Sequence, residues 1–427
     1  GLWSVKLYKA DIEMDLRTRN MAGFQLLDIQ DYPGQGSAFV GILDAFMESK
    51  GITTPEEWRQ WCSPVVPLLE MKKFCFEDGE KIQAKVKVAN YGGSLLKGKK
   101  LKWHLAAENG LFCMDDGTFS TKDGEVRKNV GDLMAEDEGV LNIFSYDEGL
   151  VEVGELNGVF HVQKPTKLLL TLNIEGTEAR NSYELWVYPK KALEKKGVII
   201  AKDLNQEVVK VLEKGGKVLW MPTASSHFVA ADNKALQSDN SVLQADDTLS
   251  QADNATPYTV GGLFQTDYWN YRMFKTICEN NKKKISPGTL GILTNPEHPI
   301  FKGFPTEMHT NWQWFPVIKE SHPLVLDNFA KDYRPIVQVI DNIERNHKLG
   351  LVMEWKVGAG KLLVCMSDLE MAAKYPEGRA FYESVLGYMQ SDEFNPAAEI
   401  TMDELKKKLA EKPRQVSLKE LNNISQY

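Results

Sequence analysis

The stretch Lys81-Ile82-Gln83-Ala84-Lys85-Val86-Lys87-Val88-Ala89-Asn90 decides the fold of the middle of the chain. Apolar and polar side chains alternate along it, and a period of two residues predicts a β-strand with one apolar face. A strand of this kind belongs to a sheet that covers a core on one side and meets water on the other, as antiparallel sheets commonly do.

Further segments around this stretch have the same character. Leu101–Leu105 and Tyr183–Tyr188 alternate, and Leu168–Leu172 is another apolar run. Turn signals recur between such segments: Asp78-Gly79, Asp116-Gly117, Asp123-Gly124 and Asn157-Gly158. Seven or eight short strands over about 120 residues predict an immunoglobulin-like β-sandwich. We place it at residues 66–190, after the linker signal Ser63-Pro64-Val65-Val66-Pro67.

Residues 191–391 change to an alternation of strands and helices. Gly197–Ala201 indicates a strand, Asn205–Glu213 a helix and Gly215–Met221 a second strand. More strands are expected at Tyr333–Ile340, Leu349–Val357 and Gly360–Met366, with a helix at Arg379–Met389. This rhythm predicts an open, flavodoxin-like α/β domain. Residues 392–427 are expected to be a tail with one charged helix, Met402–Ala410.

Residues 1–65 also favour an α/β structure. Lys9–Leu16 has helical spacing, and Thr54-Pro55 has the N-cap and first-position residues of a helix start. Ala22–Ile29 is a nearly continuous apolar run, which is typical of a buried parallel strand. One such unit cannot bury both faces of its strand. Residues 1–65 are therefore expected to complete a larger barrel or sheet, or to lie against the next domain.

Composition excludes several classes of function. The 427 residues carry a formal net charge of −8, so the basic footprint of nucleic-acid binding is missing. No apolar run reaches the roughly 18 residues of a membrane span, and the first residues lack the pattern of a signal peptide. The five cysteines show no CxxC spacing, and the P-loop and GxGxxG patterns are absent. We expect no metal site and no cofactor.

The loop Gln30-Asp31-Tyr32-Pro33-Gly34-Gln35-Gly36 follows the predicted strand of residues 22–29. Strand C-termini are where barrels and open sheets place their sites. Amides and carboxylates suit sugar hydroxyls, and an aromatic face can stack on a sugar ring. The candidate substrate-binding residues at this barrel rim are Asp28, Gln30, Asp31, Tyr32 and Gln35. The alternative is a loop in which Pro and Gly make the turn and Gln satisfies backbone groups; the residues alone leave both readings open.

Residues 17–46 resemble the eighth strand and helix of the (β/α)8 barrel in bacterial proteins similar to family 2 glycoside hydrolases, the β-galactosidase and β-glucuronidase relatives of gut glycan degraders. The resemblance implies a retaining mechanism with two carboxylates. In that family these lie on the fourth and seventh strands, which would precede residue 1. No catalytic residue is therefore carried over, and Glu13 and Glu48 are interpreted as solvated helix positions.

The resemblance implies a function for the chain as a whole. The chain would be the accessory C-terminal region of a glycoside hydrolase that cleaves β-glycosidic bonds. The parent protein would be periplasmic or extracellular, and its partner would be a carbohydrate. The chain alone is expected to be inactive. The alternative is a carbohydrate-binding or oligomerisation module without enzymatic activity, which leaves a homo-oligomer possible.

Two segments, Met308-His309-Thr310-Asn311-Trp312-Gln313-Trp314-Phe315-Pro316 and Glu344-Arg345-Asn346-His347-Lys348-Leu349-Gly350, fit the appended domains of the same gut proteins. The region 191–391 thus resembles the class I amidotransferase-like domains that accompany some β-galactosidases. A working amidotransferase would need a Cys nucleophile on a strand–helix elbow, and Cys365 is followed by Met366-Ser367-Asp368 without the glycine-rich turn. We therefore expect an inactive domain; the rival is thiol-dependent activity at Cys365 or Cys278. Four aromatic residues of this region are possible sugar contacts: Tyr268, Trp269, Trp312 and Trp314. The alternative is that they are buried in the core or at a domain interface.

Overall fold

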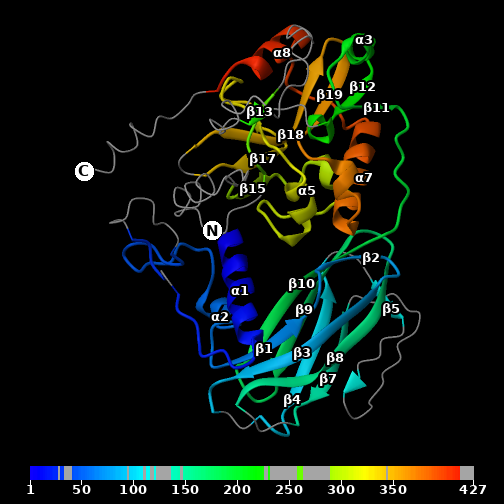
Figure 1. The fold of residues 1–427 in the computed structure, drawn as a ribbon. Helices are drawn as coiled ribbons and strands as arrows, with labels where there is room; N and C mark the ends of the chain where they lie inside the picture. Colours follow the sequence, from blue (N-terminus) through cyan, green and yellow to red (C-terminus); the bar gives the residue numbers. More distant parts are fainter. Residues whose placement is uncertain are drawn as a thin grey trace, which may run out of the picture. The chain divides into compact units, whose positions relative to one another are not determined.

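The computed structural model describes residues 1–26, 29–32, 41–93, 96–108, 112–115, 120–121, 136–144, 148–225, 229–230, 257–262, 289–342 and 345–413. The chain forms two compact units (Figure 1). The first comprises residues 1–32 and 39–192, and the second comprises residues 33–38 and 193–427. Residues 1–65 and the sandwich region thus share one unit.

The first unit contains two β-sheets. One has the order β1(Val65–Glu70)-β3(Lys81–Asn90)-β8(Gly149–Val162)-β5(Phe112–Asp115), with β6(Ser120–Thr121) also on β8. The other has the order β2(Cys75–Glu77)-β10(Arg180–Tyr188)-β9(Thr166–Ile174)-β4(Lys100–Ala107)-β7(Glu136–Asn142). The β2–β10 pair is parallel, and the other pairs of these two sheets are antiparallel. The prediction of an all-β region of two sheets is confirmed.

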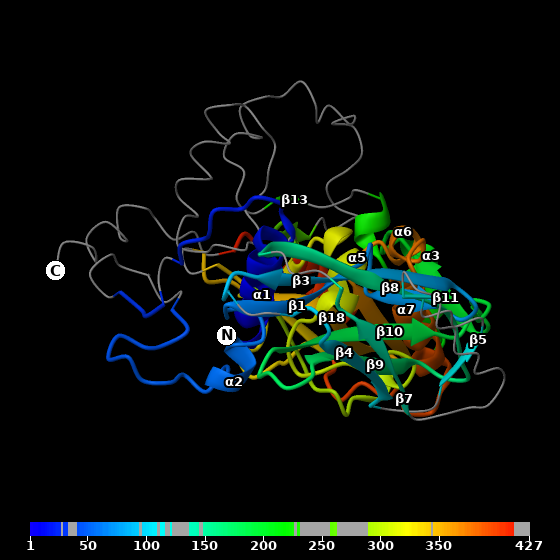
Figure 2. The same ribbon diagram turned by 90° about the horizontal axis from the view of Figure 1, so that it is seen from below.

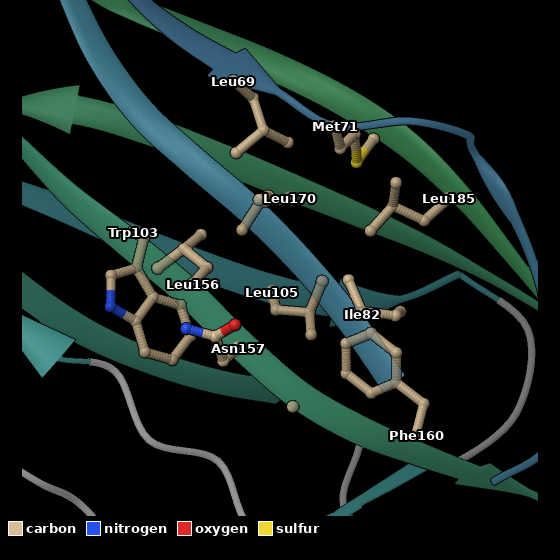
Figure 3. Close-up of a pocket in the computed structure, with 12 residues that line it drawn as sticks. Leu69, Met71, Ile82, Trp103, Leu105, Leu156, Asn157, Phe160, Leu170 and Leu185 are labelled. Carbon is tan, nitrogen blue, oxygen red and sulfur yellow. The ribbon is translucent and has the colours of Figure 1, made fainter. Parts of the chain in front are cut away.

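The core of the first unit lies between these sheets. Four alternate apolar residues of the stretch 81–90 are buried there: Ile82, Ala84, Val86 and Val88. Figure 3 shows side chains of both sheets around a small cavity, with Ile82 and Leu156 from one sheet and Leu105 and Leu170 from the other. Its volume of about 30 Å³ and apolar lining make it a packing defect and not a ligand site.

Helix α1(Leu2–Arg17) packs on the outer side of β1 and β3, and lies beside these strands in Figures 1 and 2. Ile12 and Leu16 pack with Val66 and Leu68 in a second apolar cluster, which also contains Trp61. Both sides of β1 are therefore buried. The short helix α2(Pro55–Trp58) starts in a full capping box between Thr54 and Glu57, as the sequence predicted for its start.

Glu13 corrects the sequence interpretation, because it is buried and not solvated, with 3% of its surface exposed. Its Oε2 accepts hydrogen bonds from Arg17 Nη1 at 3.2 Å and from the Tyr183 hydroxyl at 3.1 Å. Asn181 Nδ2 donates to its Oε1 at 2.7 Å, and Lys9 forms an ion pair with it. A buried carboxylate is tolerated only when it is paired and hydrogen-bonded in this way.

The strand predicted at Ala22–Ile29 is wrong for its described residues, 22–26 and 29, which form no regular strand. Phe24 and Ile29 are 39% and 48% exposed, so these two apolar side chains of the run are not in a core. The pairing found nearby, within the part of the chain that the structure describes, is an isolated parallel bridge between Gln30 and Leu43. The segment therefore does not have the structure of a barrel strand.

The second unit contains a mixed sheet. Strands β11(Val198–Ala201), β12(Lys217–Trp220) and β19(Gly360–Cys365) are parallel, and α3(Gln206–Glu213) connects the first two. Strand β18(Lys348–Val357) runs antiparallel to β19 and is followed by β17(Val337–Ile340) and β15(Gly291–Thr294), also antiparallel. The sheet branches at β18, which also pairs with β16(Leu324–Val325). From β16 the sheet continues to β14(Tyr258–Thr259) and then to β13(Val229–Ala230). A flavodoxin-like domain is therefore not supported, because that fold has a parallel sheet.

Helices complete the second unit: η2(Pro222–Ser225), η4(Pro299–Phe301), η5(Trp312–Trp314), α5(Phe315–Lys319), α6(Leu369–Ala372), α7(Pro376–Gln390) and α8(Met402–Ala410). Leu405 and Leu409 of α8 are buried, and Lys408 Nζ donates to the Asn328 carbonyl at 2.9 Å. The helix predicted in a tail thus packs onto this unit. Among the described residues, none of the helices has the length and apolarity needed to cross a membrane.

Candidate functional site

A cleft of about 470 Å³ opens in the second unit, a size that suits a small molecule. It lies where β15 ends and β17 begins, beside the second half of β18 and the segment after α7. It is lined by Leu293, Thr294, Asn295, His298, Tyr333, Arg334, Pro335, Ile336, Gln338, Glu354, Ala397 and Ala398.

The sheet register brings part of this lining together. Leu293 of β15 stands directly opposite Gln338 of β17, so the two side chains share one face of the sheet. Leu293 is 41% exposed, while its neighbour Ile292 is buried with Val339 on the other face. Strand alternation therefore places an apolar group and an amide side by side at the cleft.

Glu354 is the carboxyl group of the lining. It lies on β18, and the hydroxyl of Tyr388 from α7 donates a 2.8 Å hydrogen bond to its Oε2. Burial raises the pKa of Glu354 above its ordinary value, against the opposing effects of the Tyr388 hydrogen bond and of Lys361. The ionised carboxylate is thus partly desolvated, which strengthens any hydrogen bond that a ligand donates to it.

His298 is the N-cap of η4, and its Nδ1 accepts a 3.3 Å hydrogen bond from the Ile300 N–H. This bond assigns the proton of the neutral ring to Nε2. Burial lowers the pKa of His298, which favours the neutral form. Its ring meets that of Tyr388 edge to face, at 5.2 Å between centroids.

Tyr333 fixes the start of the cleft wall. Its hydroxyl donates to the Glu354 carbonyl at 3.1 Å and accepts from the Glu354 N–H at 3.2 Å. Its ring stacks on Trp355, with 4.9 Å between centroids and 13° between planes. Burial raises the pKa of Tyr333, so it stays a neutral phenol. These contacts tie the segment before β17 to β18.

Other polar groups of the lining have few partners among the described residues. Arg334 Nη1 donates to the carbonyls of Lys331 at 2.8 Å and Tyr333 at 3.2 Å. Asn295 Oδ1 accepts from the Glu297 N–H at 3.2 Å, which turns the loop after β15. The remaining guanidinium and amide N–H groups of these side chains are suited to hydrogen-bond a ligand.

The carboxyl groups of the cleft lining can be compared with those that a glycosidase needs. Both mechanisms of most glycosidases need a pair of carboxyl groups. Of the described residues that line the cleft, Glu354 alone supplies one. The described ranges also contain no group of three or more His, Cys, Asp or Glu placed to hold a metal ion.

The predicted barrel-rim residues that the structure describes, Gln30, Asp31 and Tyr32, belong to the first unit and are not among the residues that line this cleft. Asp31 is buried, and its Oδ1 accepts from Gly41 N at 3.0 Å and from Lys50 Nζ at 2.6 Å, so it holds its own loop. Gln30 is half-buried and Tyr32 is 49% exposed. Asp28 and Gln35 lie outside the described residues.

Trp314 is a core residue, which corrects its place among the possible sugar contacts. It is fully buried and lies 5.0 Å from both Phe304 and Phe381, measured between ring centroids. Its Nε1 donates to Thr306 Oγ1 at 2.8 Å, so its polar atom is also satisfied. Trp312 is half-buried at the start of η5. Tyr268 and Trp269 lie outside the described residues.

Cys365 ends β19 inside the core. Burial raises the pKa of its thiol to about 12, so the nucleophilic thiolate is scarce at neutral pH. Cys278, the other thiol considered, lies outside the described residues. The environment of Cys365 is that of a structural cysteine.

Sequence reasoning missed the residues that line the cleft, including Glu354, His298, Tyr333 and Gln338. One signal was present: Glu354 interrupts the otherwise apolar stretch Leu349–Trp355. A carboxyl group in the middle of a buried strand needs a partner or a function. The other three are ordinary residues for loops and strands, and only the fold brings them together.

Two family models match parts of the chain. A domain of unknown function (DUF8487) matches residues 226–410, which include the whole cleft, and a second domain of unknown function (DUF8488) matches residues 137–189. None of the curated proteins matches the sequence.

Three solved structures with similarity to the chain each cover less than a third of it. A conjugative transposon lipoprotein from Bacteroides eggerthii is 9% identical, covers 29% of this chain and 96% of its own, and has a TM-score of 0.20. A type II cohesin domain from the Acetivibrio cellulolyticus cellulosome is 8% identical over 29% and 95% of the two chains, with a TM-score of 0.18. A cohesin module from a Clostridium perfringens family 33 glycoside hydrolase is 11% identical over 30% and 99%, with a TM-score of 0.18. Similarities at these TM-scores support no assignment.

Proposed function

We propose that this chain is a non-catalytic, carbohydrate-binding accessory region of a glycoside hydrolase of the family 2 type, and that the cleft of the second unit holds the saccharide. The parent enzyme would be periplasmic or extracellular and would hydrolyse β-glycosidic bonds with carboxylates outside this chain. The immunoglobulin-like sandwich of the first unit would serve as a scaffold.

The observation that carries the proposal is the composition of the cleft. Gln338, Asn295 and Arg334 offer N–H donors, and Glu354 offers a carboxylate acceptor. Leu293 and Ile336 supply apolar surface between them. Saccharides present hydroxyl groups that both donate and accept, together with apolar C–H faces, so a lining of this kind suits them. The single carboxyl group favours binding over hydrolysis.

A glycan array tests the proposal with the whole chain. Gln338→Ala removes an amide from the cleft, and Gln83→Ala removes an exposed amide from β3 in the first unit as a matched control. We expect wild type and Gln83→Ala to bind the same saccharides, and we expect Gln338→Ala to lose binding to these saccharides. An empty array, or binding that survives Gln338→Ala unchanged, would contradict a saccharide site in this cleft.

An assay with nitrophenyl glycosides tests the non-catalytic part of the proposal. We expect no turnover by this chain, because the carboxyl pair of a glycosidase is missing from the described lining of the cleft. Robust hydrolysis that is lost on changing Glu354 to Gln would assign the chain an active site of its own.

A further inference from the structure

Tyr388 does not line the cleft, yet it contacts two ionisable side chains of the cleft wall, Glu354 and His298. Its hydroxyl donates to Glu354 Oε2 at 2.8 Å, and its ring packs edge to face on His298. The Tyr388 side chain is itself fixed, because the residue is 5% exposed and its ring packs against Phe394 at 5.3 Å between centroids. One rigid side chain from α7 thus joins β18 to η4.

The bond between Tyr388 and Glu354 has a fixed direction. Burial and the neighbouring Glu354 carboxylate raise the pKa of Tyr388, so the hydroxyl keeps its proton and remains a donor. Tyr388 therefore occupies Oε2 of Glu354, which belongs to the cleft lining, and none of the hydrogen bonds among the described residues is made to its Oε1. His298 Nδ1 is occupied by Ile300 N–H in the same manner, which leaves Nε2–H as its donor.

We propose that Tyr388 is the positioning residue of the cleft: it holds Glu354 as an acceptor and His298 as a donor, so that the two together recognise a hydroxyl group of the saccharide. The inference rests on the proposed function and deepens it, because it names the groups that select the ligand. A sugar hydroxyl can donate to Glu354 Oε1 and accept from His298 Nε2–H. A ligand without a group that both donates and accepts would leave one of these partners unpaired.

The arrangement implies a pH dependence of binding. The charged and titratable groups around Glu354 are Tyr388 on α7, Lys361 on β19 and Tyr333 before β17. Around Tyr388 lies Glu393 as well. Protonation of Glu354 converts the acceptor into a competing donor, so affinity falls as the pH drops through the raised pKa of Glu354. Protonation of His298 would break the bond that its Nδ1 accepts from Ile300 N–H, and burial lowers the pKa of His298, which keeps the ring neutral to a lower pH than an exposed histidine.

Tyr388→Phe tests the proposal because it keeps the ring and removes the hydroxyl. Two readouts are needed: the pKa of Glu354, followed by NMR of carboxyl-labelled glutamate in the free protein, and the affinity for the array's best saccharide as a function of pH. We expect the Glu354 pKa to rise, since a hydrogen bond to the charged form is lost. We expect affinity at neutral pH to fall about tenfold, and its acid midpoint to rise with the Glu354 pKa.

Tyr375→Phe is the matched control, because Tyr375 is the N-cap of the same helix and is 42% exposed. We expect it to leave both readouts at their wild-type values. If Tyr388→Phe moves neither the pKa of Glu354 nor the acid midpoint, Tyr388 has no positioning role. The NMR readout needs no ligand, so it tests the role of Tyr388 even if the array finds no saccharide and the proposed function fails.

Glu354→Gln provides a second variant in case Tyr388→Phe does not fold. Gln keeps an oxygen that can accept from Tyr388 and cannot ionise. We expect binding to Glu354→Gln to be weaker than to wild type and to lose its acid midpoint. A midpoint that persists in Glu354→Gln would assign the pH dependence to another group and overturn the proposal.

Discussion

Asn181 of β10 donates a 2.7 Å hydrogen bond from its Nδ2 to Oε1 of Glu13 in α1. The bond joins residues that are 168 positions apart, and the same carboxylate accepts from Tyr183 two residues along β10. Glu13 is thus the point at which the N-terminal helix is fixed to the sandwich.

Glu13→Ala should destabilise the first unit by about 3–5 kcal/mol, because removing one partner of a buried ionic network leaves the others unpaired. The half-buried side chain of Lys9 would lose its carboxylate partner, and desolvation already lowers the pKa of Lys9. Amide hydrogen exchange of α1 and β10, followed over a series of urea concentrations, measures the loss in free energy of unfolding of this unit. Glu56→Ala, at an exposed ion pair with Arg59, should change stability by less than about 0.5 kcal/mol. Equal effects of the two substitutions would disprove the role of Glu13.

Trp314 and Phe315 are adjacent in sequence and opposite in environment, at 0% and 56% exposure. Trp314→Ala should cost the second unit about 3–5 kcal/mol, because it opens a cavity among Phe301, Phe304 and Phe381. Phe315→Ala should cost much less. Thermal unfolding of both variants checks this, and a mild effect of Trp314→Ala would return that residue to the candidates for ligand contact.

Acid should weaken the second unit through Asp327. Burial opposes ionisation of this carboxyl, but its hydrogen bonds with His347 Nδ1 at 2.8 Å and the Lys348 N–H at 2.9 Å prevail and lower its pKa. A carboxyl whose pKa is lower in the folded state adds stability above its unfolded pKa of about 3.9, and this is lost as pH falls through the folded value. Asp327→Asn should therefore lower Tm at pH 7 and have a smaller effect near pH 3. Asp392 is exposed, and Asp392→Asn should therefore leave Tm unchanged at both pH values. If Asp327→Asn lowers Tm as much at pH 3 as at pH 7, the proposed contribution of Asp327 is wrong.

Much of the first unit follows from local pattern. The alternation at residues 81–90 predicted both the strand β3 and its buried face, because one face of that strand meets the core. Thr54 and Pro55 predicted the start of α2 through capping chemistry that is local. The apolar run that begins at Ala22 led to the wrong prediction of a buried strand. Apolar residues are buried only if another surface covers them, and Phe24 is 39% exposed.

The direction of the strands in the second unit could have been predicted more closely. The predicted strands 349–357 and 360–366 are separated by Gly358 and Ala359, and a parallel connection needs a dozen or more residues. Gly358 has a φ of +60°, as a tight hairpin turn requires, and β18 and β19 pair antiparallel across it. The alternation of strands and helices elsewhere in this region favoured a parallel sheet, and the hairpin was therefore not predicted.

The cleft could not have been predicted, because its residues come from segments more than 100 positions apart, from Leu293 to Ala398. Glu354 was the one local signal. Its partner Tyr388 lies on the buried side of a helix, where a tyrosine is expected for packing alone. Only the placement of α7 and β18 brings the hydroxyl to the carboxylate.

The central claim is that the cleft of the second unit binds a saccharide. Its most direct test is calorimetric titration of the array's best saccharide into wild type, Gln338→Ala and Gln83→Ala at neutral pH. We predict a saturable binding isotherm for wild type and Gln83→Ala, and an affinity at least about tenfold lower for Gln338→Ala. The same affinity for all three proteins, or no heat of binding to wild type, would contradict the claim.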